Sequence, residues 1–283
     1  MNHSNQKQEA GKGSFSRGLN ADPLIFFSVL GLVLLILLAA IINRQQTALF
    51  LFGLQDSIVE YFSWLFSLTV TGLLVFSVWL ACSRYGNIKL GPDDSEPEFN
   101  NIAWVSMLFS AGMGIGLVFF GVAEPVLHYI APLQAAPETI AAAREAMRLS
   151  IFHWGLHAWA IYAVLGLALA YYHFRHNQPL AIRSTLEPLL GKHTHQWPGK
   201  LIDVLAVLGT LFGLATSLGL GASQINAGLG ELFGIAISTN TQIIIIAVIT
   251  FCATVSLVLG LKKGIRRLSE LNMMLALLLM GFV

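Results

Sequence analysis

Charged residues are scarce in this chain. Asp, Glu, Lys and Arg together make up 11% of its 283 residues, against about 25% in an ordinary soluble domain. Hydrophobic residues reach 55%, and 26 residues are glycine, which is commoner in membrane helices than in soluble ones. We therefore expect an all-α membrane protein, with much of its surface facing the lipid bilayer.

Cysteine is nearly absent, and neither sign of charge dominates. Cys82 and Cys252 both stand in apolar stretches, where a thiol behaves as a small hydrophobic side chain rather than as part of a disulfide or metal site. The net charge of +1 gives no reason to expect nucleic-acid binding. His153 and His157 share a helix face but have no third ligand nearby, so a metal site is not expected there.

Long apolar runs fill most of the chain. A membrane helix needs about 20 mostly apolar residues, and six stretches meet this requirement. They cover residues 23–42, 58–82, 102–123, 149–172, 201–223 and 242–261. A seventh begins near Leu271 and reaches Val283 before it is long enough to span. We expect the chain to stop inside a helix, as a fragment or a truncated gene product.

Residues 1–22 are polar and basic, and we expect them to form a disordered cytoplasmic N-terminus. A cleaved signal peptide is the rival interpretation. It is disfavoured because the apolar run 23–42 is as long as a full span, and because no small-residue cleavage pattern follows it.

The basic residues fall unevenly on the two sides of these spans. If the N-terminus is cytoplasmic, only Arg44, Arg144 and Arg148 of the 16 Lys and Arg residues lie outside. This bias agrees with the positive-inside rule and predicts a multi-pass protein of the bacterial inner membrane with a cytoplasmic N-terminus. The outside loop 131–147 contains a helix-like stretch, which we expect to lie on the membrane surface.

Three alternating glycines, Gly112, Gly114 and Gly116, interrupt the third span. Glycine costs about 1 kcal/mol relative to alanine inside a helix. Three together weaken the helix and free backbone groups for a ligand, as in the broken helices of transporters. The spacing of Gly112 and Gly116 also suits close helix packing, and the sequence leaves both interpretations open. Glu124 follows at the outer end of the span, as a gate or, more simply, as a structural cap.

Three aromatic residues, Trp154, Trp159 and Tyr162, stand close together in the fourth span. A quaternary ammonium group has no hydrogen to donate, so proteins hold it with aromatic faces. On one continuous helix Trp154 and Trp159 would be about 140° apart, so the three would wrap a ligand without sharing a narrow stripe. The alternative is an interfacial aromatic belt, which explains Trp154 near the outer end but explains Tyr162, halfway along, poorly.

Hydroxyl and amide side chains recur along the fifth span, from Thr210 through Thr216 to Gln224 and Asn226. Such groups either bond a neighbouring helix or line an ion path. Bonding to a neighbour is the default interpretation for any one of them.

Five stretches of the sequence resemble the betaine/carnitine/choline transporter family. They are GPDDSEPEF (91–99), AGMGIGLVFFGVAEP (111–125), FHWGLHAWAIYAVLGLALAY (152–171), GTLFGLATSLGLG (209–221) and GLKKGIRRLSELNM (260–273). The resemblance implies a leucine-transporter-like inverted-repeat fold. Residues 23–84 would form its two leading transmembrane helices and residues 85–283 its first repeat, with the seventh helix truncated and the second repeat absent.

The resemblance also implies where a solute would bind. The family's aromatic cage matches the three aromatic residues Trp154, Trp159 and Tyr162. Its glycine stretch matches the segment from Gly112 through Gly114 to Gly116. Family members with Asp at the position of Gly116 tend toward choline or proton coupling, so glycine there favours a zwitterion such as glycine betaine and favours sodium.

Ion-binding residues follow from the same resemblance. One sodium site of the family matches the backbone around Ser110, Ala111 and Met113. A second sodium site uses two threonines one turn apart. Thr210 matches the first of them, but Leu214 stands at the partner position, so the number of coupled ions stays open. No other metal and no cofactor are expected.

We therefore expect a secondary active symporter, not an enzyme, that imports a quaternary-ammonium compatible solute such as glycine betaine or choline for osmoprotection. The coupling ion would be sodium or a proton, and the resemblance admits a homotrimer. One alternative is a truncated fragment without transport activity of its own. A weaker alternative is an intramembrane enzyme, for which His153 and His157 would need an acidic partner that the sequence does not place beside them.

Overall fold

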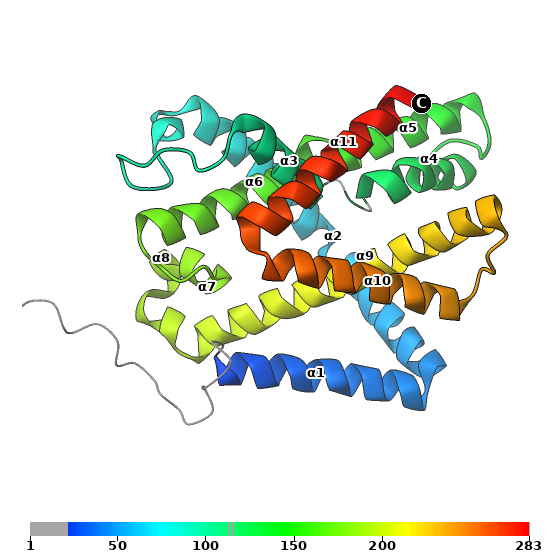
Figure 1. Cartoon of the computed structure of the whole chain (residues 1–283), viewed down its shortest axis with the longest axis horizontal. Coiled ribbons are helices and arrows are strands. Elements are labelled where there is room, and N and C mark those ends of the chain that lie inside the picture. Colours follow the sequence, from blue (N-terminus) through cyan, green and yellow to red (C-terminus); the bar gives the residue numbers. More distant parts are fainter. Residues whose placement is uncertain (1–21, 113, 115, 283) are drawn as a thin grey trace, which may run out of the picture. The chain divides into compact units, whose positions relative to one another are not determined.

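The computed structural model describes residues 22–282 apart from 113 and 115, and these residues form helices and loops without strands. This confirms the all-α prediction. Residues 1–21, expected to be disordered, lie outside the described residues. Figure 1 follows the chain from α1 to α11.

Five helical segments of the described chain are long and apolar enough to cross a membrane. They are α1 (Pro23–Ile42), α2 (Arg44–Cys82), the segment Ile140–Arg175, α9 (Trp197–Phe233) and α10 (Thr239–Val258). They overlap five of the six predicted spans and identify a multi-pass membrane protein. The third predicted span is different, because two shorter apolar helices take its place.

The glycines of the third span divide it. Helix α3 (Asn101–Gly112) ends at the first of them, and the chain resumes as a π-helix, η2 (Gly116–Phe120), followed by α4 (Gly121–Ile130). The span expected over 102–123 is therefore broken at the glycines that were expected to interrupt it. The physical reason is the one that the glycines already indicated, namely that several glycines in succession make the helical backbone costly to maintain.

Helix α2 begins earlier than expected. The second predicted span begins at residue 58, but the helix runs from Arg44. The Asn43 side chain accepts the backbone N–H of Gln46 at 3.1 Å, which caps the first turn. An apolar run marks the part of a helix that suits lipid, whereas capping and propensity decide where the helix starts.

The fourth span is built from α5 (Ile140–Trp154) and α6 (Leu156–Ala170), which meet at Gly155. A Cβ atom on Gly155 would lie 2.6 Å from the carbonyl oxygen of Ile151, so the junction requires glycine. The helix-like stretch expected within 131–147 is helical from Ile140 and begins α5. The first turn of α5 is capped by Thr139 through the N–H of Ala142 at 3.1 Å.

The remaining elements of the described chain are six short helical turns and one longer helix. The short ones are η1 (Arg84–Asn87), η3 (Tyr171–Arg175), α7 (Ile182–Thr185), α8 (Glu187–Leu190), η4 (Gly191–His195) and η5 (Leu261–Ile265), and the longer one is α11 (Arg266–Phe282).

The chain divides into two compact units. The first comprises the described part of residues 1–61 together with 181–210. Here one oxygen of the Asp22 carboxylate caps α1 by accepting the N–H of Leu24 at 3.0 Å, and the other pairs with the Lys200 ammonium at 2.9 Å. This single carboxylate ties the start of α1 to the start of α9.

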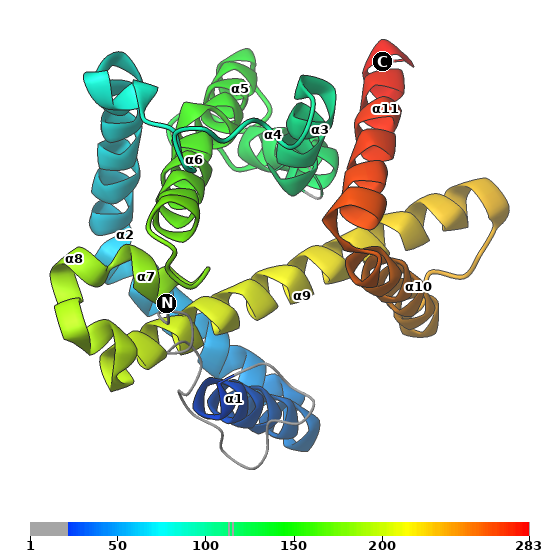
Figure 2. The same ribbon diagram turned by 60° about the vertical axis from the view of Figure 1, so that its left-hand side comes forward.

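The second unit comprises residues 62–180 and the described part of 211–283. Within it α4 packs along α5, and α3 packs along α11 (Figures 1 and 2). At one end of the unit the Arg175 guanidinium donates to the carbonyl oxygens of Lys89 and Gly91, both at 3.0 Å, and to the Asp93 carboxylate at 2.9 Å. These bonds fix the loop after α2 to the end of the fourth span.

Candidate functional site

Two tryptophan rings occupy the space above two of the glycines. A Cβ atom on Gly112 would lie 2.6 Å from Cη2 of Trp159, and one on Gly116 would lie 2.5 Å from Cζ3 of Trp154. No real side chain approaches another atom so closely. Gly114 differs, because nothing lies within 4 Å of its Cβ position. The structure therefore uses Gly112 and Gly116 to seat the indoles and leaves Gly114 facing open space.

The three aromatic residues of the fourth span do not lie on one helix. Because the chain breaks at Gly155, Trp154 belongs to α5, whereas Trp159 and Tyr162 belong to α6. The angle of about 140° expected for one continuous helix therefore does not apply. The rings of Trp159 and Tyr162 are 5.9 Å apart and tilted by 43°, and Tyr162 remains 56% exposed.

Trp154 has a further aromatic neighbour that the sequence analysis did not identify. Its ring stacks on Phe120 at a centroid distance of 5.9 Å and an interplanar angle of 28°. Phe120 is the last residue of η2, four positions after Gly116. The glycine-broken segment thus supplies both the opening into which the indole fits and an aromatic side chain beside it.

A buried carboxylate holds the nitrogen edge of the same indole. Glu124 is 7% exposed, and it accepts the Nε1–H of Trp154 at 2.6 Å. His153 Nδ1 lies 2.8 and 2.9 Å from the two carboxylate oxygens, and His128 Nε2 lies 3.6 Å from one of them. The four side chains form one polar cluster between α4 and α5.

The expectation that no acid accompanies His153 is therefore wrong. Glu124 stands 29 residues earlier in the chain, and only the packing of α4 along α5 brings the two together. The sequence signal for this contact was a single glutamate within an otherwise apolar stretch. A carboxylate in such a place is costly unless it is paired.

The residues expected to bind an ion are only partly described. The Ser110 hydroxyl donates to the carbonyl oxygen of Ser269 at 3.3 Å and accepts the side-chain amide of Asn272 at 3.1 Å. Ala111 lies near the end of α3, and Met113 lies outside the described residues.

Thr210 belongs to the first compact unit and Ser110 to the second. The Thr210 hydroxyl donates to the carbonyl oxygen of Ala206, one turn earlier in α9, at 2.9 Å. Within the described ranges, no group of three His, Cys, Asp or Glu side chains is placed to hold a metal ion.

The other polar residues of α9 form hydrogen bonds either within the helix or to segments farther along the chain. Thr216 donates to the carbonyl oxygen of Phe212 in its own helix at 2.9 Å. The Gln224 amide donates to the carbonyl oxygen of Val118 at 3.1 Å, which supplies a partner to the π-helix η2. Asn226 has no exposed surface and holds the loop after α9, through Ala236 and Ser238.

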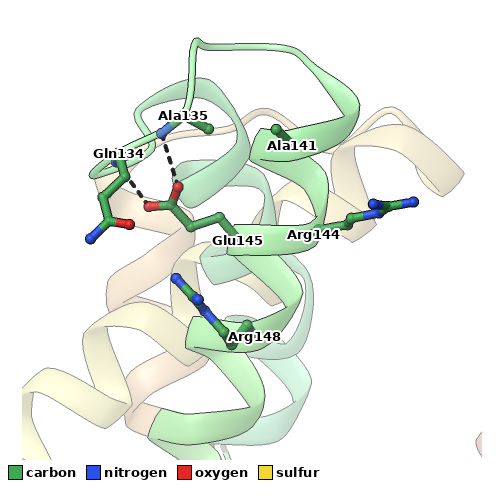
Figure 3. Close-up of a pocket in the computed structure, with 6 residues that line it drawn as sticks. All are labelled: Gln134, Ala135, Ala141, Arg144, Glu145 and Arg148. Atoms are coloured by element: carbon green, nitrogen blue, oxygen red, sulfur yellow. Dashed lines mark hydrogen bonds between the residues drawn. The ribbon is translucent and has the colours of Figure 1, made fainter.

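A cavity of about 430 Å³ lies beside α5 (Figure 3). The residues that line it precede the three aromatic residues of the fourth span in the sequence. The cavity is lined by Gln134, Ala135, Ala141, Arg144, Glu145 and Arg148. The buried Glu145 carboxylate fills the turn before α5, where it accepts the backbone N–H groups of Leu133, Gln134 and Ala135 at 2.8, 3.1 and 3.0 Å. None of the residues that line the cavity is a predicted site residue, so we attribute the cavity to the packing of this turn rather than to a binding site.

The comparison with known sequences identifies the family. The profile described as BCCT, betaine/carnitine/choline family transporter, matches residues 24–283. The chain belongs to this family. The resemblance seen in the sequence is thereby confirmed, and the BCCT family is one of transporters rather than enzymes.

Curated relatives of this BCCT chain carry transporter names. The glycine betaine transporter of Acinetobacter baylyi is 46% identical over 268 residues, which are 95% of this chain and 41% of the relative. The high-affinity choline transport protein of Escherichia coli is 47% identical over 262 residues, 93% of this chain and 39% of the relative. The glycine betaine transporter OpuD of Bacillus subtilis is 49% identical over 230 residues, 81% of this chain and 45% of the relative. The chain thus spans less than half the length of these relatives.

Proposed function

We propose that this BCCT chain forms one part of a secondary active symporter that imports a quaternary-ammonium compatible solute, such as glycine betaine or choline, across the bacterial inner membrane. The observation that carries the proposal is the seating of two indoles on a glycine-broken helix, with Trp159 over Gly112 and Trp154 over Gly116. The names of relatives that are 46–49% identical support this choice of solute.

The chemistry of the solute explains why aromatic residues suit it. A trimethylammonium group offers no N–H, so hydrogen-bond acceptors cannot bind it, whereas aromatic faces attract its positive charge. The tilted rings of Trp159 and Tyr162 present such faces, and the exposure of Tyr162 leaves its ring accessible. We assign Trp154, Trp159 and Tyr162 to the solute cage, and the segment from Gly112 through Gly114 to Gly116 to its floor.

Sodium, as the coupling ion, would require oxygen ligands rather than a cluster of acidic side chains. In transporters of this general architecture, unwound backbone carbonyls bind sodium near the membrane midplane. The helix break after Gly112 makes such carbonyls available, and we propose the backbone around Ser110, Ala111 and Met113 as one part of a sodium site. The family resemblance, in which Asp at the position of Gly116 accompanies proton coupling, supports sodium as the coupling ion. Thr210, with Leu214 as its partner position, supports a second sodium site only weakly.

The inside bias of Lys and Arg supports a cytoplasmic N-terminus. Two ion pairs agree with this assignment of sides, because each joins two segments that the bias places on the same side of the membrane. Asp22 pairs with Lys200 in one unit, and Glu98 pairs with Lys262 at 2.8 Å in the other. The leucine-transporter-like inverted repeat, with leading helices over 23–84 and the first repeat over 85–283, and a homotrimeric assembly remain part of this proposal.

Uptake measurements test the function directly. Because the chain spans 41% of the Acinetobacter relative, we suggest a chimera that joins this chain to the part of that relative beyond the alignment. It would be expressed in cells that lack their own betaine and choline uptake. Accumulation of labelled glycine betaine that depends on an inward sodium gradient is the expected result.

Two comparisons make the uptake result decisive. The 283-residue chain expressed without the added part tests the alternative of a fragment inactive by itself. A chimera that reaches the membrane and accumulates neither betaine nor choline, under a sodium or a proton gradient, would overturn the proposed function. Uptake that follows the proton gradient alone would keep the solute and replace the ion.

A further inference from the structure

We propose that Glu124 is a positioning residue for the solute cage, which acts by holding the Trp154 indole in place. The inference rests on the proposed function, because it takes Trp154 as a wall of the cage. It goes beyond that function by assigning a determinant of solute affinity to a carboxylate that needs no contact with the solute.

The Trp154 ring lies 4.9 Å from the ring of His153, its neighbour in sequence, and has three further kinds of support. It lies in the space above Gly116, stacks on Phe120 and donates its Nε1–H to Glu124 at 2.6 Å. The first two supports are apolar contacts, which still allow the ring to slide or turn in its own plane. Only the hydrogen bond fixes the nitrogen edge, because hydrogen bonds are directional. Glu124 therefore determines which part of the ring faces the solute.

A second buried carboxylate shows what an ordinary structural role looks like in this chain. Glu145 is as buried as Glu124, with both residues 7% exposed. Glu145 accepts backbone N–H groups from a turn, so it stabilises a loop. Glu124 instead contacts three side chains in the described part of the chain, those of Trp154, His153 and His128. A carboxylate of this kind acts on the orientation of rings.

The two histidines strengthen this assignment. His153 reaches the carboxylate from α5, next to Trp154 in sequence, and His128 reaches it from α4, one turn after Glu124. They occupy directions in which the Glu124 side chain would otherwise be free to turn. The carboxylate is thus itself held in place. A residue that positions another side chain must have its own conformation fixed by its neighbours.

The first test observes the hydrogen bond itself. The chain is labelled with ¹⁵N-tryptophan and placed in lipid nanodiscs, where the six indole N–H groups give separate signals and Trp154→Phe assigns one of them. We expect Glu124→Ala to move the Trp154 signal upfield more than any other, and Glu124→Gln, which keeps a carbonyl acceptor, to move it less. Glu145→Ala is the matched control and should leave it in place. A Trp154 signal unmoved by both Glu124 substitutions would overturn the inference.

The second test asks whether Glu124 acts on affinity through the indole. In the betaine uptake assay of the chimera, Glu124→Ala is expected to raise KM by about 2- to 30-fold, the range of a lost cation–π contact, with a smaller change in the maximal rate. Glu124→Gln should restore most of the affinity. Trp154→Phe keeps an aromatic ring but has no N–H, so in that background Glu124→Ala should have no further effect on KM.

The outcomes separate this inference from the proposed function. If the unmodified chimera transports no betaine, the proposed function fails, whereas the indole signal still tests the contact. If the chimera transports betaine and Glu124→Ala raises KM equally with Trp154 and with phenylalanine at that position, the proposed function stands and Glu124 is not a positioning residue.

Discussion

The six-membered ring of Trp154 stands where a side chain on residue 116 would have to be, with Cζ3 only 2.5 Å from a Cβ built on Gly116. Because Cζ3 belongs to a rigid ring, a Cβ atom added at residue 116 would force the whole indole to move. We expect Gly116→Ala to weaken betaine affinity by about 2- to 30-fold, as for loss of a cation–π contact. The KM of uptake by the chimera measures this.

Gly121→Ala is the matched control for that substitution. It adds the same methyl group five residues later, at the start of α4 and outside the assigned cage, and its Cβ meets nothing within 4 Å. Affinity should therefore stay close to that of the unmodified protein. If the two substitutions weaken affinity equally, backbone conformation rather than contact with the indole explains the effect.

The pair formed by Asp22 and Lys200 predicts a loss of stability in acid. The hydrogen bond from Lys200 lowers the pKa of the Asp22 carboxyl below its ordinary value of 3.8, against the opposing effect of burial. A carboxyl with a lowered pKa in the folded state contributes stability above its unfolded pKa and loses it as the pH falls through the folded value. The unfolding midpoint in detergent, followed from pH 7 to about 3, should show this contribution decline.

The Asp22→Asn variant isolates the effect. It should be less stable than the unmodified chain at pH 7, and the difference should shrink as the pH falls below 3.8. Asp94→Asn, at an exposed loop position, serves as the control and should lie on the unmodified curve. A difference for Asp22→Asn that stays constant across this range would show that the ion pair does not link α1 to α9.

The fully buried Asn226 predicts a local loss of stability. Its side chain donates to the carbonyl oxygen of Ala236 at 3.1 Å and accepts the N–H of Ser238 at 3.1 Å. Asn226→Ala removes both hydrogen bonds, each of which contributes about 0.5–1.5 kcal/mol, so the two together contribute about 1–3 kcal/mol. We expect the free energy of unfolding, measured by denaturant titration, to fall by about that amount.

Thr216→Val provides the comparison within the same helix. The Thr216 hydroxyl donates to Phe212 of its own helix and Thr216 is exposed, so removal of the hydroxyl should change the free energy of unfolding by less than about 0.5 kcal/mol. Equal losses in the two variants would contradict the loop-holding role of Asn226.

Membrane orientation is accessible through single cysteines. With Cys82 and Cys252 replaced, a cysteine at Ile140, which is 77% exposed, should react with an impermeant reagent from outside intact cells. One at Leu189, which is 82% exposed, should react only after the membrane is opened. The physical reason is the inside bias of Lys and Arg, and the reverse labelling pattern would refute the topology.

Composition and hydropathy predicted the helical class and most of the spans, because lipid requires long apolar helices whatever their neighbours are. The glycine break was also foreseeable, since three glycines weaken any helix. The start of α2 and the break at Gly155 were not, because a cap such as Asn43 or one glycine has only a small local effect. Those boundaries depend on hydrogen bonds that apolar runs do not report.

The contacts of the site were predictable only in part. The sequence presented Trp154, Trp159 and Tyr162 as one aromatic group, and family resemblance supplied a role that stays a prediction. It did not pair Trp154 with Glu124, which stands 30 residues away, because such a bond requires knowing that α4 packs along α5. Nor did spacing distinguish Gly114 from Gly116, since the difference is made by which glycine an indole from another helix covers.

The central claim is that aromatic rings of this chain recognise the positive charge of a quaternary ammonium group. Competition against labelled glycine betaine tests it with 3,3-dimethylbutanoate, which keeps the shape and carboxylate of betaine but has carbon in place of the charged nitrogen. We predict that the chimera binds betaine about 2- to 30-fold more tightly, and that this ratio falls toward one in Trp159→Ala and Tyr162→Ala but less in the phenylalanine variants. Equal competition by the two compounds in the unmodified chimera would contradict the account.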